Sequence, residues 1–164
     1  MNTETEYTNK QKLESQGFIR TRHGVYKLTA LEQIYRKGCL EYSETTYGGQ
    51  DRLRAGEKLS SDYEKSHFST VNSGWQNDKI DSGHYKLYDS DVNYIRSRYL
   101  TAVRSIPREF WPAVRQICIE NKIPNFEKET SSRKRTQYRY LWYCDLCRGL
   151  DRLIDHYRHH KIHI

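Results

Sequence analysis

The chain has 164 residues, which allows one moderately sized domain or a small domain with an appendage. Only 35% of its residues are apolar, but 13% are aromatic, and this combination excludes a disordered chain. No stretch approaches the roughly 18 apolar residues of a membrane span, and the four cysteines occur without a secretion signal, so we expect a cytoplasmic protein without membrane contact. The formal net charge of +7 belongs to residues 91–164, because residues 1–90 contain thirteen basic and thirteen acidic side chains.

The N-terminal end of the chain is polar and weakly patterned. Residues 1–16 predict a disordered tail, since they contain almost no aliphatic side chains. Two short apolar segments, 18–21 and 25–28, follow the tail and flank a glycine. They predict a hairpin in which Gly24 adopts a positive φ.

Two helices are expected after the hairpin. Thr29 is a suitable N-cap for a short helix over 30–37 that ends at Gly38. Apolar side chains then recur at helical spacing over 50–67. We expect these elements to form a small N-terminal helical region over 17–67.

Residues 68–89 are rich in Ser, Asn, Gly and Asp and show no sustained period, so they predict a linker. A helical pattern follows over 91–105, with Ser90 as its expected N-cap and Pro107 after its end. The linker would therefore separate the N-terminal region from a basic region over 90–164.

The basic region is expected to contain two further helices, over 109–121 and 132–159, with a turn after Pro124. Together with the preceding helix they predict a mainly α fold containing a helix-turn-helix. An inward stripe is expected on the last helix at Trp142, Leu146, Leu150, Leu153 and Tyr157. The side chains expected to face away from it are Arg148, Asp151, Arg152 and Asp155.

The start of the last predicted helix is the densest basic segment of the chain. A cationic stripe at the start of a helix is typical of nucleic-acid readers, because binding a phosphate backbone releases its condensed counterions. A solvated helix face is the alternative interpretation. We predict that seven side chains of this segment bind double-stranded DNA. The serines are expected to cap the helix and bind a phosphate, the cations to neutralise phosphates, and the glutamine amide to pair with adenine. They are Ser131, Ser132, Arg133, Lys134, Arg135, Gln137 and Arg139.

Aromatic side chains alternate with a cation just after this segment. Their arrangement is compatible with base stacking, but Trp142 continues the inward stripe and Tyr138 lies one turn before it. We therefore expect Tyr138 and Trp142 to pack, and Tyr140 and Tyr143 to lie on the surface.

Cys144 and Cys147, followed by His160 and His163, resemble the spacing of a zinc finger. A continuous helix through this segment would hold the cysteines and the histidines about 20 Å apart at 1.5 Å per residue. The leucine stripe favours the helix, so we expect no metal and no cofactor.

The tripeptide Gly48-Gly49-Gln50 matches the one that peptide-release factors use to hydrolyse peptidyl-tRNA. Nothing around it resembles the usual context of that motif, and no phosphate-binding loop or serine elbow occurs elsewhere. We therefore expect the protein not to be an enzyme.

Several blocks resemble an alphaproteobacterial domain family of unknown function. The first, at residues 52–65, runs arginine, alanine, glycine, glutamate, a basic residue and leucine, then an acidic-aromatic pair. Trp75, the pair at 117–118 and the segment 150–157 are similar to later blocks in the same order. The resemblance covers about residues 50–158, and the chain departs from it by a longer, more basic stretch before Tyr138.

This family includes regulators of gene-transfer-agent and prophage-like gene clusters, with a domain similar to region 4 of sigma factors. The resemblance implies a DNA-binding transcription factor that contacts RNA polymerase, as an activator or an antiterminator. The competing interpretation is an adaptor that binds polymerase or another regulator and barely touches DNA. Its support is the neutral first part of the chain, where Tyr42, Tyr47 and Tyr63 are expected to be exposed.

Overall fold

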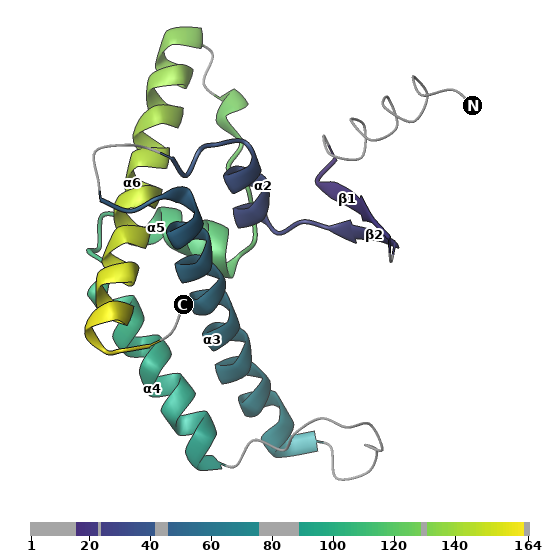
Figure 1. The fold of residues 1–164 in the computed structure, drawn as a ribbon, viewed down its shortest axis with the longest axis vertical. Helices are drawn as coiled ribbons and strands as arrows, with labels where there is room; N and C mark the ends of the chain where they lie inside the picture. The colour runs from purple at the N-terminus through teal and green to yellow at the C-terminus, as the bar shows by residue number, and fades with distance from the viewer. Residues whose placement is uncertain (1–15, 23, 42–45, 76–88, 129–130, 163–164) are drawn as a thin grey trace.

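A computed structural model describes residues 16–22, 24–41, 46–75, 89–128 and 131–162. The predicted disordered tail lies almost entirely outside these residues. The predicted mainly α fold is confirmed (Figure 1). In chain order the elements are β1 (Phe18–Thr21), β2 (Gly24–Lys27), α2 (Ala30–Arg36), α3 (Gly49–Trp75), α4 (Asp89–Ser105), α5 (Trp111–Val114), the π-helical turn η1 (Arg115–Ile119), the 3-10 turn η2 (Phe126–Lys128) and α6 (Ser132–His159).

The core forms where the second half of α6 packs against α3, α4 and α5 (Figure 1). Four members of the predicted stripe on α6 have no exposed surface: Leu146, Leu150, Leu153 and Tyr157. The fifth, Trp142, is half-buried and packs against the same core. The same hydrophobic core contains buried residues of α2, α3, α4 and η1. Helices α2 and α3 therefore share one core with the basic part of the chain. Within the described residues, no helix is both long enough and apolar enough to cross a membrane.

The hairpin and the helix after it follow the local signals in the sequence. The two strands pair antiparallel, with Phe18 opposite Lys27, and Gly24 has the expected positive φ of 136°. The Thr29 hydroxyl accepts a hydrogen bond from the amide of Glu32, whose carboxylate accepts one from the Thr29 amide, so α2 begins with a complete capping box. Figure 1 shows the hairpin standing off the helical body, whereas α2 is part of it.

Two helices begin or end differently from the prediction. α3 continues through Trp75, so the first residues of the predicted linker over 68–89 are helical. Adding a residue to an existing helix forms another backbone hydrogen bond and costs about 1 kcal/mol or less in propensity, so the Ser and Asn residues there do not stop it. α4 begins at Asp89, so Ser90 lies inside the helix and is not its N-cap.

The helix predicted over 109–121 is shorter and changes its winding. Pro112 stands in the first turn of α5, as expected, and the chain then widens into the π-helical turn η1. Residues 120–131 separate η1 from α6, a longer connection than the three or four residues of a typical helix-turn-helix. The described elements therefore do not establish the helix-turn-helix, which remains a prediction.

Two buried ion pairs connect α3 to its neighbours. The guanidinium of Arg52 on α3 has no exposed surface and donates to both carboxylate oxygens of Asp151 on α6, at 2.7 and 3.2 Å. Asp62, also fully buried on α3, accepts hydrogen bonds from Arg98 of α4, one of them at 2.9 Å. The prediction that Asp151 faces away from the core is therefore wrong, because α3 supplies a buried cation at its position.

Candidate nucleic-acid interface

The basic first half of α6 extends beyond the packed helices (Figure 1). Residues 131–134 and 136–141 are exposed, and Arg135 is half-buried. The predicted DNA-binding side chains therefore lie on one exposed half-helix, while the second half of the same helix forms the core. This division explains why apolar periodicity is strong after Tyr143 and weak before it.

One side of this half-helix packs around Phe126 of η2. The ring of Phe126 lies 6.0 Å from Tyr138, 5.9 Å from Trp142 and 5.9 Å from Tyr143, measured between centroids. The guanidinium of Arg139 lies 5.6 Å from the Phe126 centroid, within the range of a cation–π interaction. These contacts place Tyr138, Arg139, Trp142 and Tyr143 next to η2.

The aromatic prediction is partly wrong. Tyr143 is buried, and burial is the largest cause that raises the pKa of its hydroxyl to about 12. Tyr138, which was expected to pack, keeps 59% of its surface exposed and meets Phe126 only at its edge. Tyr143 lies three residues before Leu146 and seven before Leu150, so helical spacing places it on the buried face of α6. The edge contact of Tyr138 depends instead on Phe126, a residue outside the helix.

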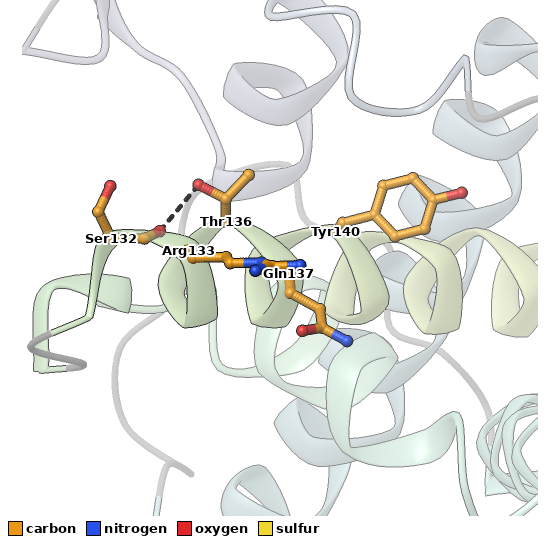
Figure 2. Close-up of a pocket in the computed structure, with 5 residues that line it drawn as sticks. All are labelled: Ser132, Arg133, Thr136, Gln137 and Tyr140. Carbon is orange, nitrogen blue, oxygen red and sulfur yellow. Dashed lines mark hydrogen bonds between the residues drawn. The ribbon is translucent and has the colours of Figure 1, made fainter.

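The other side of the half-helix forms an open hollow. Figure 2 shows the five side chains that line it, on successive turns of α6: Ser132, Arg133, Thr136, Gln137 and Tyr140. Three of them, Ser132, Arg133 and Gln137, were predicted to bind DNA. Thr136 and Tyr140 were not, although spacings of three and seven residues from Arg133 place them on the same face.

The N-terminus of α6 differs from the expected cap. Ser131 occupies the N-cap position with extended backbone angles, but its hydroxyl forms no capping hydrogen bond, so the predicted side-chain cap is absent there. The first turn contains no acidic residue. Arg133, Lys134 and Arg139 form no ion pair with any described residue. Positive charge and the positive end of the helix dipole therefore coincide at this end of α6.

The other sequence motifs have structural surroundings of their own. α6 runs without interruption past Cys144 and Cys147 to His159, and the described residues contain no group of three or more side chains placed to hold a metal. His163 lies outside them. The amide oxygen of Gln50 accepts a 2.8 Å hydrogen bond from the Tyr35 hydroxyl at the start of α3. Neither observation tests the expectation that the protein lacks a metal and is not an enzyme.

Comparison with known proteins returned no matching family model, no matching curated protein and no matching solved structure.

Proposed function

We propose that the protein binds double-stranded DNA through the first half of α6. The observation that supports this most directly is an exposed half-helix with four cations, Arg133, Lys134, Arg135 and Arg139, attached to a packed core. A helix of this diameter, about 10–12 Å with its side chains, matches the roughly 12 Å width of the major groove. A solvated face needs no such concentration of like charges, which repel one another on a helix.

The test measures how duplex binding depends on salt. Each phosphate contact contributes a slope of about −0.9 in log K against log salt concentration. Replacing all four cations by Ala should flatten the slope by about 0.9 for each contact that is lost. The result that contradicts the proposal is an unchanged slope and affinity in a variant with a normal circular dichroism spectrum.

A matched control separates local contacts from net charge. Four exposed cations lie away from α6: Arg36 and Lys37 at the end of α2, and Arg96 and Arg104 on α4. Their replacement by Ala removes the same charge, and we expect it to change the slope much less. A parallel titration with structured RNA distinguishes duplex DNA from RNA, the nearest alternative polymer.

The narrower role rests on the sequence resemblance alone. It is that of a cytoplasmic, non-enzymatic transcriptional activator or antiterminator that acts with RNA polymerase on phage-derived or gene-transfer-agent genes. A genome-wide occupancy map tests it. Enrichment upstream of such clusters supports an activator, signal along the transcribed genes supports an antiterminator, and even occupancy over the chromosome contradicts both.

The adaptor alternative has a different structural basis from the one expected. Tyr47 and Tyr63 are half-buried, and Tyr42 lies outside the described residues. Exposed large apolar side chains occur on β2, at Val25 and Tyr26, and on α4, at Tyr94 and Leu100. Recovery of polymerase subunits from a nuclease-treated extract, without measurable duplex affinity, would favour the adaptor.

A further inference from the structure

The cluster at Phe126 divides the basic half of α6 into two sides. Trp142 packs on Phe126, and nine residues at about 100° each place Arg133 on the opposite side of the helix from Trp142. Arg139 is turned toward the cluster, with its guanidinium over the Phe126 ring. The cations of α6 are therefore not equivalent, because the core and η2 determine which of them point away from the protein.

The side turned away has the chemistry of a base-reading surface. The planar guanidinium of Arg133 can donate two parallel hydrogen bonds to O6 and N7 of guanine, and the amide of Gln137 can pair with N6 and N7 of adenine. Thr136 is exposed at the border of this side, seven residues before the buried Tyr143. Its hydroxyl donates to the Ser132 carbonyl at 3.1 Å, so its hydrogen is already used and its methyl group remains for an apolar contact (Figure 2). A thymine methyl group is the base feature that suits it.

We infer that Arg133, Thr136 and Gln137 form the base-reading face of α6, while Arg139, held by Phe126, contributes affinity without sequence preference. This inference rests on the proposed binding of duplex DNA. It identifies the site as one for the major groove, since the minor groove does not distinguish the base pairs in this way.

The spacing along the helix restricts the sequence that is read. Arg133 and Gln137 are one turn apart, a rise of about 6 Å at 1.5 Å per residue. Base pairs follow one another about every 3.4 Å along the duplex axis. The guanine read by Arg133 and the adenine read by Gln137 should therefore lie within about two positions of each other.

Selection from a randomised duplex library tests the inference with the full chain. Four proteins are compared: the wild type, Arg133→Lys, Gln137→Ala and Arg139→Ala. Arg133→Lys is the decisive variant, because lysine keeps the charge for a phosphate but lacks the planar fork that pairs with guanine. All three positions are exposed on α6, so folding should persist, and circular dichroism checks it.

The wild type should enrich a motif with guanine and adenine in the predicted spacing. Arg133→Lys should lower the guanine preference on the order of tenfold to a hundredfold with little change in salt slope, and Gln137→Ala should do the same for adenine. Arg139→Ala should enrich the unchanged motif with lower affinity.

Two results overturn the inference while leaving DNA binding intact. One is an unchanged motif in both Arg133→Lys and Gln137→Ala. The other is a wild type that binds every duplex equally. Absence of any duplex binding by the wild type would instead contradict the proposed function.

Discussion

Removing the charge of Asp151 should destabilise the protein strongly. The Arg52 side chain has no exposed surface, and its Nε and one terminal nitrogen donate to the two oxygens of Asp151. Burial opposes the charge on Arg52, but the hydrogen bond to Asp151 and nearby negative groups raise its pKa above the ordinary value. Asp151→Asn leaves this guanidinium buried without a counter-charge, which costs about 3–5 kcal/mol. At about 2–4 °C per kcal/mol for this chain length, Tm should fall by about 6–20 °C.

Thermal and urea unfolding followed by circular dichroism measures the loss. Asp155→Asn is the matched control, because Asp155 lies one turn later on α6 but is exposed, and we expect it to change stability by less than about 1 kcal/mol. The double variant Arg52→Met with Asp151→Leu removes both charges and should recover much of the loss. If Asp151→Asn and Asp155→Asn lower stability equally, the argument from burial is refuted.

Three further outcomes follow from the packing of the core. Gly149→Ala should cost about 1–3 kcal/mol by chemical denaturation, since the new methyl carbon would lie 2.5 Å from the Val114 side chain. Burial, and after it the neighbouring histidines, lowers the pKa of His156. The unfolded chain therefore takes up this proton more readily, so the free energy of unfolding should decrease as the pH falls below about 6.5. His156→Gln should make this decrease smaller. Burial raises the pKa of the Cys118 thiol to about 12, so iodoacetamide at pH 8 should alkylate Cys144 well before Cys118 in the folded chain.

Each outcome has a result that contradicts it. Gly48→Ala is the control for Gly149, because no atom lies near the methyl carbon it would add; equal effects of the two changes would exclude a steric cause. A stability profile between pH 5 and pH 7 that His156→Gln leaves unchanged would assign the dependence to other groups. Equal rates of alkylation by mass spectrometry would show that Cys118 is accessible.

Features set by neighbours in the sequence were predictable. The capping box at Thr29, the positive φ of Gly24 and the bounds of α6 over 132–159 all follow from residues a few positions apart. The inward stripe of α6 follows from helical periodicity alone. The exposed position of the basic segment also agrees with its composition, which contains too few apolar side chains to form a core.

Features set by distant residues were not predictable. Asp151 has the charge of a surface residue, and its burial depends on Arg52, which is 99 residues away in the sequence. The edge contact of Tyr138 depends on Phe126, which lies outside the helix. Arg133 and Gln137 were predicted to bind DNA, but the sequence did not show that they share the hollow with Thr136 and Tyr140. A single sequence shows which residues are present, but it does not show which distant residues contact one another.

Because α6 is one continuous helix, its packed half and its exposed half move together. A helix that runs unbroken from Ser132 to His159 transmits any tilt of its packed end to its free end. Its outer half is about 18 Å long at 1.5 Å per residue, so a tilt of about 5° displaces the tip by about 1.5 Å. That shift is half the length of a hydrogen bond. A substitution deep among the packed helices can therefore alter what the tip touches without changing any residue at the tip.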